Sequence, residues 1–130
     1  MAKILFAQNL APSIYEFVVD APLVAHKCKP GQFVMIRTDE YSERIPLTIA
    51  DFDREKGTIT LIVQAVGNTT KDLCENYKEG DDILDIAGPL GQPSHMKNFG
   101  TVVVVGGGIG VAPVYPIARA YHELGNKVIS

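Results

Sequence analysis

The sequence has few of the residues that build metal centres or covalent cross-links. Its 130 residues include no tryptophan, two cysteines and three histidines. Cys28 and Cys74 lie far apart, and neither a C-x-x-C motif nor a pair of histidines accompanies them. We therefore expect no metal site. We also expect both cysteines to be small buried hydrophobic residues rather than partners in a disulfide.

Long hydrophobic runs and an excess of basic residues are absent as well. No stretch approaches the roughly 18 apolar residues of a membrane helix, and residues 1–3 lead into a strand pattern without a signal peptide. The 12 basic and 15 acidic residues give a net charge of −3, so the chain has no basic stripe to neutralise nucleic-acid phosphates. We expect a cytoplasmic protein that binds neither membranes nor nucleic acids.

The first two thirds of the chain have the alternating hydrophobic pattern of short β-strands. Turns rich in glycine, proline and aspartate separate these strands, and a helix from Thr69 or Thr70 to Tyr77 precedes the last of them. The pattern predicts a small antiparallel barrel. The six predicted strands cover residues 2–9, 14–20, 32–38, 46–51, 58–66 and 82–87.

The pattern changes after the sixth strand. Residues 88–93 hold two glycines and two prolines, which predicts a linker. A strand over residues 101–105, a helix from Pro113 to about Leu124, and the start of a second parallel strand at residues 127–130 follow. This pattern predicts the beginning of a parallel β-α-β arrangement.

A cluster of glycines connects the strand at 101–105 to the following helix. Gly107, Gly108 and Gly110 have no Cβ, so backbone N–H groups could approach a phosphate at the N-terminus of this helix. The alternative is a tight turn that needs glycine only for packing. The spacing departs from G-x-G-x-x-G/A because Val111 occupies the last position. The ending G-K-[ST] is missing, which excludes a P-loop.

Two further stretches contain residues suited to binding an anionic dinucleotide. Arg44 can bind a phosphate bidentately, and Thr48 offers a hydroxyl to the polar edge of a ring. An edge strand with a surface arginine is the alternative explanation. The segment Gly67-Asn68-Thr69-Thr70-Lys71 adds hydroxyl groups at a helix N-terminus, which is a second candidate phosphate site.

Five motifs together resemble the ferredoxin–NADP reductase superfamily. They are PGQFV at 30–34, RIPLTIAD at 44–51, GNTTKDL at 67–73, GPLG at 88–91 and GGGIGVAP at 106–113. Within the superfamily the sequence resembles the dihydroorotate dehydrogenase electron-transfer subunits and the small subunits of NADH-dependent ferredoxin:NADP oxidoreductase (sulfide dehydrogenase), with RIPLTIAD favouring the second group. The resemblance implies a six-stranded antiparallel Greek-key barrel that binds FAD over residues 1–98. The first β-α unit of an NAD(P)-binding α/β domain would occupy residues 99–130. Because a complete domain of this kind needs about five parallel strands, the chain would then be a fragment or a truncated product of a longer subunit.

The resemblance also implies which residues bind the cofactors. Those expected to contact FAD are Arg44 and Thr69 with Thr70 at the pyrophosphate, Pro46, Leu47 and Thr48 around the isoalloxazine, and the backbone of Ile62, Val63 and Gln64 along the adenosine and ribityl groups. Those expected to approach the nicotinamide nucleotide are Gly107, Gly108, Gly110, Ala112 and Pro113. The superfamily often has arginine three residues before the Ser/Thr, where this chain has Ile45, so the identity of the phosphate-binding residue stays open.

The implied function is that of an electron-transfer subunit that passes electrons between NAD(P)H and an iron–sulfur or flavin partner through FAD. The flavin supplies the chemistry, so no catalytic acid, base or nucleophile is expected. Two cysteines cannot provide the four ligands of a [2Fe–2S] cluster. We expect a catalytic partner subunit, and self-association through the exposed C-terminal strand-helix unit. A non-catalytic barrel that acts as a binding or assembly module is the alternative. The preference for NADH or NADPH stays open.

Overall fold

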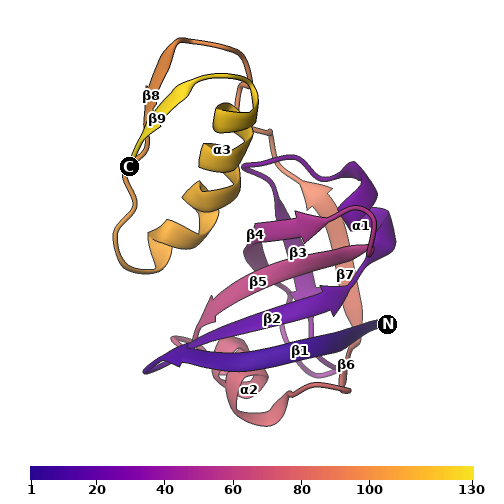
Figure 1. Ribbon diagram of the computed structural model, residues 1–130. Helices are drawn as coiled ribbons and strands as arrows, with labels where there is room; N and C mark the ends of the chain where they lie inside the picture. Colours follow the sequence, from indigo (N-terminus) through magenta and orange to yellow (C-terminus); the bar gives the residue numbers. More distant parts are fainter.

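A computed structural model describes residues 1–130 as a β-barrel with a smaller C-terminal unit beside it (Figure 1). The barrel is built from seven strands and two helices. In chain order these are β1 (Ala2–Ala11), β2 (Ile14–Asp20), α1 (Pro22–Lys27), β3 (Phe33–Arg37), β4 (Ile45–Asp53), β5 (Thr58–Gln64), α2 (Asn68–Asn76), β6 (Asp82–Ile83) and β7 (Asp85–Leu90). The C-terminal unit consists of β8 (Thr101–Val103), the 3-10 turn η1 (Gly108–Gly110), α3 (Val111–Glu123) and β9 (Lys127–Ile129).

All neighbouring strands of the barrel are antiparallel, in the order β6-β1-β2-β5-β4-β3-β7. Strands β3, β4 and β5 are consecutive, and β2 lies beside β5, which is Greek-key topology. The two ends of the sheet, β6 and β7, are separated along the chain only by Leu84, so the sheet nearly closes on itself. The predicted antiparallel Greek-key barrel is therefore confirmed.

The predicted number of strands was wrong by one. The segment expected as a single strand at 82–87 is broken at Leu84, which belongs to neither strand. The Leu84 N–H donates to the carbonyl oxygen of Thr38 at 3.2 Å. The split gives β6, which pairs with β1, and β7, which pairs with β3. One chain segment thus serves both edges of the sheet.

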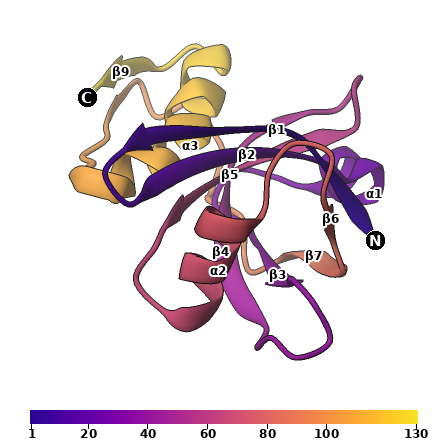
Figure 2. The same ribbon diagram turned by 90° about the horizontal axis from the view of Figure 1, so that it is seen from below.

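The hydrophobic alternation of the strands fills the barrel. On β5, Ile59, Leu61 and Val63 are completely buried, as the alternation predicted. Helix α2 closes one end of the barrel and contributes Leu73 and Cys74 to the same core (Figure 2). Burying apolar side chains in this way is the main stabilising term for a barrel of this size.

One helix was missed, and the predicted linker is in part a strand. No helix was predicted at α1, a six-residue helix with proline in its first turn, which packs Val24 and Ala25 into the core. Residues 88–90 are not a linker, because β7 continues to Leu90 and pairs with Phe33 of β3. At Gly88 an added Cβ would lie 2.9 Å from Val34 Cγ1, so this glycine is needed for the close approach of the two strands.

The C-terminal unit is the predicted beginning of a parallel β-α-β arrangement. Strands β8 and β9 pair in parallel, with Thr101 opposite Lys127. The first strand is shorter than expected and ends at Val103, and α3 begins at Val111, two residues before the predicted start. The buried side chain of Asn126 accepts hydrogen bonds from the N–H groups of Phe99 (2.6 Å) and Gly100 (3.0 Å), which anchors the chain entering β8.

Candidate functional site

Strand β4 changes partners along its length, and the first cavity lies at its start. Its second half pairs with β5, but residues 45–48 pair with β3 instead. A cavity of about 710 Å³ lies between the start of β4 and the N-terminus of α2. It is lined by Asp39, Tyr41, Ser42, Glu43, Ile45, Pro46, Val66, Gly67, Asn68, Thr69, Thr70 and Asp72.

The N-terminus of α2 presents backbone donors to this cavity. The first helical hydrogen bond runs from the Lys71 N–H to the Gly67 carbonyl oxygen at 2.9 Å, so the preceding N–H groups of the first turn have no helical acceptor. The Thr70 hydroxyl accepts hydrogen bonds from the N–H groups of Val66 (3.0 Å) and Gly67 (2.8 Å). Thr69 is buried. The Thr70 hydroxyl therefore shapes the turn, and the backbone amides of the first helical turn are groups left to bind an anion.

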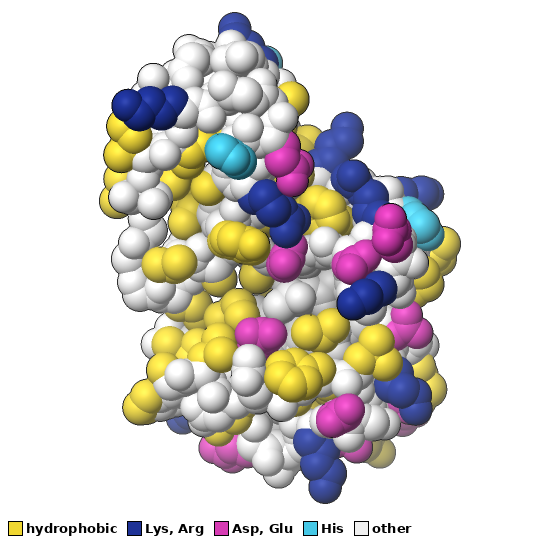
Figure 3. All heavy atoms as spheres, viewed as in Figure 1, with side chains coloured by type: hydrophobic (Ala, Val, Ile, Leu, Met, Phe, Trp, Pro, Cys, Tyr) yellow, Lys and Arg dark blue, Asp and Glu magenta, His cyan; other side chains and the backbone are white.

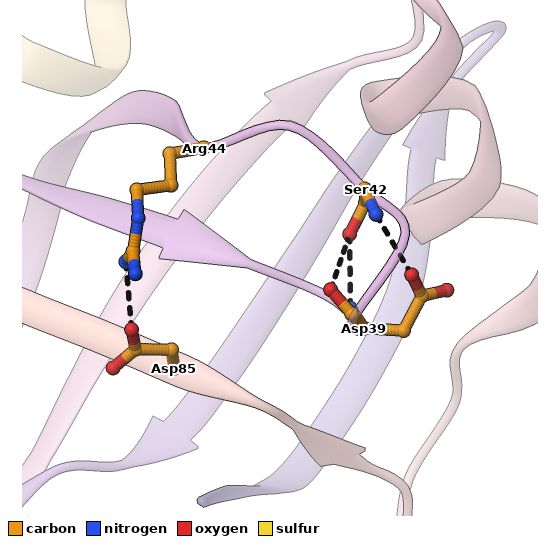
Figure 4. Close-up of polar contacts among 4 residues, drawn as sticks. All are labelled: Asp39, Ser42, Arg44 and Asp85. Carbon is orange, nitrogen blue, oxygen red and sulfur yellow. Dashed lines mark hydrogen bonds and ion pairs between the residues drawn. The ribbon is translucent and has the colours of Figure 1, made fainter.

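Carboxylates make up much of the charge around the first cavity. Asp39 accepts a hydrogen bond from the Tyr41 N–H at 2.8 Å. It also accepts one from the Ser42 N–H at 2.9 Å, and together these bonds fold the loop before β4 (Figure 4). Glu43 and Asp72 add two further carboxylates, and no lysine or arginine lines the cavity. A phosphate bound here would need a cation from outside the lining.

Arg44 lies between the lining residues Glu43 and Ile45 and is a candidate for that cation, but its guanidinium is bound elsewhere. Its Nη1 donates to Asp85 Oδ2 at 2.6 Å, across from β4 to the start of β7 (Figure 4). The hydrogen bond from Arg44 holds the pKa of Asp85 below its ordinary value. Both side chains are partly exposed, so the pair can open at low cost.

The remaining residues predicted for the flavin lie along β4 and β5. Pro46 and Thr48 are exposed, whereas Leu47 is half-buried and packs against the core. On β5, Ile62 is half-buried and Gln64 is exposed. The Val63 side chain is fully buried in the core, so only its backbone could contact a ligand.

A second cavity lies between the barrel and the C-terminal unit. Its volume is about 490 Å³, and most of its lining is hydrophobic. Figure 3 shows hydrophobic side chains gathered where the C-terminal unit meets the barrel. The lining residues are Leu10, Ala11, Ile14, Glu16, Ala50, Asp51, Thr60, Ile62, Gly108, Ile109, Val111, Ala112 and Tyr115.

This arrangement brings the predicted site residues together in two groups. Pro46, Thr69 and Thr70 share the first cavity, while Ile62, Gly108 and Ala112 share the second. Strand β4 joins the two cavities, and the four-residue step from Pro46 to Ala50 spans about 13 Å of extended chain. The other predicted residues, Arg44, Leu47, Thr48, Val63, Gln64, Gly107, Gly110 and Pro113, line neither cavity.

The glycines of the turn before α3 have different roles. A Cβ on Gly106 would lie 2.8 Å from Val114 Cγ2 and 3.0 Å from Val111 Cα, so packing alone requires glycine there. A Cβ on Gly107, Gly108 or Gly110 would meet nothing within 4 Å. Packing therefore explains Gly106, whereas the space beside the other three is open.

The structure contains no group of three or more histidine, cysteine or acidic side chains placed to hold a metal ion. Cys28 and Cys74 are buried as expected, and both are free thiols. Burial raises the pKa of both, that of Cys74 to about 11. No helix has the length and hydrophobicity needed to cross a bilayer.

Sequence reasoning missed three residues that shape these sites. Asp85, at the start of β7, is the partner of Arg44. Asp51 of β4 and Arg119 of α3 form an ion pair of 2.6 Å between the barrel and the C-terminal unit. Each pair joins residues far apart in the chain, so a single sequence carries no local pattern that reveals it.

No protein-family model matches the chain. Among characterised sequences, it is 49% identical over 120 residues to the "dihydroorotate dehydrogenase B (NAD(+)), electron transfer subunit homolog" of Thermotoga maritima, covering 92% of this chain and 42% of the relative. It is 40% identical over 128 residues to the dihydroorotate dehydrogenase B (NAD(+)) electron transfer subunit of Shouchella clausii, covering 94% of this chain and 49% of the relative. The chain thus spans about half the length of the curated relatives that it matches.

Solved structures agree with the sequence matches. The chain superimposes with a TM-score of 0.95 on a chain from the NADH-dependent reduced ferredoxin-NADP oxidoreductase, a structure described for flavin-based electron bifurcation. The two are 46% identical, and the match covers 98% of this chain and 46% of the other. Phthalate dioxygenase reductase, 20% identical with a TM-score of 0.81, shares the fold over 98% of this chain and 41% of its own.

Proposed function

Because this chain is a ferredoxin-reductase-like protein related to the dihydroorotate dehydrogenase B electron transfer subunits, we propose that it is the FAD-binding part of a flavoprotein electron-transfer subunit. Residues 1–98 would form the FAD domain, and residues 99–130 the first part of the NAD(P)-binding domain. One observation carries the proposal. Strand β4 connects a cavity at the N-terminus of α2 with an apolar cavity beside the glycine turn.

The pyrophosphate of FAD would bind in the first cavity. The free N–H groups at the start of α2 suit an anion, because they point along the positive end of the helix dipole. Arg44 would supply the missing positive charge once it leaves Asp85. The three carboxylates around the cavity make this second contribution necessary, since Asp39, Glu43 and Asp72 repel a phosphate.

The flavin ring would lie on the exposed part of β4 between the two cavities. Pro46, Leu47 and Thr48 would flank the isoalloxazine, with the Thr48 hydroxyl as a hydrogen-bonding partner. The backbone of Ile62, Val63 and Gln64 has no β4 partner and could bind the adenosine and ribityl groups. When bound, FAD supplies the acceptance of hydride from NAD(P)H and the onward transfer of single electrons.

The nicotinamide nucleotide would approach the second cavity from the glycine turn. Gly107, Gly108, Gly110, Ala112 and Pro113 lie at the start of α3, where backbone N–H groups favour a phosphate. The apolar walls of the cavity would exclude water from the space next to the flavin ring. Electrons would leave to a catalytic flavoprotein or iron–sulfur partner subunit.

We also propose that the C-terminal unit associates with a second copy of the chain. Strands β8 and β9 pair only with each other, and Val103 is 65% exposed. Val105 and Ile129 add further exposed hydrophobic side chains on the same unit. Parallel strands are normally covered on both faces and paired at both edges, so this unit has apolar surface available for contact.

Titration with FAD tests the proposed function. The purified chain should bind FAD stoichiometrically, with quenching of flavin fluorescence and a structured flavin absorbance band. Arg44→Ala should weaken binding, while the matched control Lys56→Ala removes an equal charge from a turn outside both cavities and should not. A chain that binds no FAD but gains thermal stability from a protein partner would instead support a binding or assembly module.

A further inference from the structure

Helix α3 is held on the barrel by a cluster of charged and aromatic side chains. Arg119 Nη1 lies 2.6 Å from Asp51 Oδ1 of β4. The Arg119 guanidinium carbon also lies 5.4 Å from the centre of the Phe52 ring and 5.5 Å from that of Tyr115. Arg54 stacks on the same Phe52 ring at 5.0 Å. Three different contacts therefore converge on one arginine, and two of them cross from α3 to β4.

The charge of Arg119 is well stabilised in this position. Burial acts to lower the pKa of its guanidinium, but the hydrogen bond and the charge of Asp51, with a smaller contribution from Tyr115, raise the pKa overall. The Arg119 and Asp51 side chains are only 32% and 35% exposed. A partly desolvated pair that also stacks on two aromatic rings holds its geometry better than an exposed surface pair.

The cluster stands between two cavities. Asp51 and Tyr115 line the apolar second cavity, while Arg119 and Phe52 line a neighbouring cavity of about 440 Å³ toward the C-terminal end of α3. Arg119 follows Tyr115 by one helical turn, so both side chains lie on the α3 face that meets the barrel. The ion pair thus joins a residue that lines the second cavity, Asp51, to one that lines the neighbouring cavity, Arg119.

The position of Asp51 results from the shape of β4. The ladder with β5 shifts register between Ile49 and Asp51, and Ile49 and Ala50 are both buried although they are consecutive. A register shift of this kind redirects the side chain that follows it. The strand proposed to carry the flavin therefore also presents the acidic partner of Arg119.

We propose that Arg119 is a positioning residue, which fixes the distance and angle between β4 and the glycine turn at the start of α3. This inference rests on the proposed function, because it assigns Arg119 the task of holding the nicotinamide-binding turn over the flavin strand. Arg119 itself need not contact either cofactor. Residues 95–100 also join the two units, since the Tyr121 hydroxyl donates to the His95 carbonyl oxygen and Asn126, which follows α3, bonds to Lys97 and Phe99, but these contacts do not reach β4.

A distance measurement without any cofactor tests the inference directly. Spin labels are attached at Lys78→Cys on the barrel and Lys127→Cys on the C-terminal unit, both exposed positions, and the distance between the two labels is measured. Cys28 and Cys74 are buried and should not be labelled. The labelled chain with Asp51 and Arg119 unchanged should give one narrow distance distribution. Arg119→Ala and Asp51→Asn should each broaden it markedly. Arg54→Ala, which removes the other cation on Phe52 without crossing between units, should leave it narrow.

Charge reversal and flavin reduction complete the test. Asp51→Arg combined with Arg119→Asp should restore a narrow distribution that neither single reversal allows. In the FAD-loaded chain, Arg119→Ala should raise the NADH concentration for half-maximal flavin reduction by about tenfold, as expected for losing one ion pair and its stacking contacts, while FAD affinity stays unchanged. A narrow distribution in Arg119→Ala would overturn the inference. Absence of FAD binding in the unaltered chain would instead overturn the proposed function.

Discussion

Two neighbouring glycines in the turn before α3 allow packing and ligand binding to be separated by single substitutions. Gly106→Ala would place a methyl group 2.8 Å from Val114 Cγ2 and 3.0 Å from the Val111 backbone. Valine has little freedom to rotate away on a helix, so we expect a loss of about 1–3 kcal/mol in the local stability of α3, typical of overpacking. Gly107→Ala meets no atom within 4 Å and has an extended backbone with φ of −127°. It should be neutral or slightly stabilising.

Hydrogen exchange of the α3 amides measures this difference locally. The expected loss corresponds to exchange that is about 5-fold to 150-fold faster in Gly106→Ala than in the unaltered chain. Exchange in Gly107→Ala should stay at or below the original rate. Gly107→Ala should also weaken NADH binding if the open space beside Gly107 receives a nucleotide. Equal acceleration of exchange in both variants would refute the assignment of Gly106 to packing and Gly107 to open space.

Three further predictions concern charge, thiol reactivity and association. Arg44 lowers the pKa of Asp85, so the pair stabilises the fold above the ordinary aspartate pKa of about 4 and this contribution disappears as the pH falls through the lower folded value. Asp85→Asn should therefore flatten the loss of stability in urea titrations below that pH and, by freeing Arg44, tighten FAD binding a few-fold. With a pKa of about 11, Cys74 should react with iodoacetamide at pH 8 about 100-fold more slowly than an ordinary free thiol, as followed by mass spectrometry; reaction at the rate of the urea-unfolded chain would contradict this. Sedimentation should show concentration-dependent self-association that Val103→Lys reduces and Leu23→Lys, at an equally exposed position on the barrel, does not. A monomer at all concentrations would rule out the proposed contact.

The strands of the barrel could be predicted from the sequence because each has a local pattern. The alternation over Thr58–Gln64 fixes which side chains face inward, whatever the partner strands are. The break at Leu84 could not be predicted, because its cause is a hydrogen bond to Thr38 in a distant part of the chain. Helix α1 was also missed, since six mostly apolar residues do not distinguish a helix from a strand.

Sequence patterns predict which elements border the candidate site better than they predict its geometry. The GNTTKDL motif indicated a helix N-terminus, but the helix begins at Asn68 rather than after Thr69 or Thr70. The Thr70 hydroxyl shapes the turn, and the backbone N–H groups of the first helical turn remain as donors. The partners of Arg44 and Arg119 depend on which strands and helices meet in space. Tertiary neighbours of this kind leave no trace in the spacing of a single sequence.

The change of partner strand along β4 links the proposed flavin-binding surface to the docking of α3 on the barrel. Its first half faces β3 and presents Pro46 and Thr48 outward, and its second half faces β5 and carries Asp51 to α3. A slip of one residue along this strand would turn every one of these side chains to the opposite face. An insertion or deletion in β4 would therefore alter the proposed flavin-binding surface and the docking of α3 together. Substitutions in loops or in α3 could instead change the docking of α3 or the proposed flavin-binding surface without changing both.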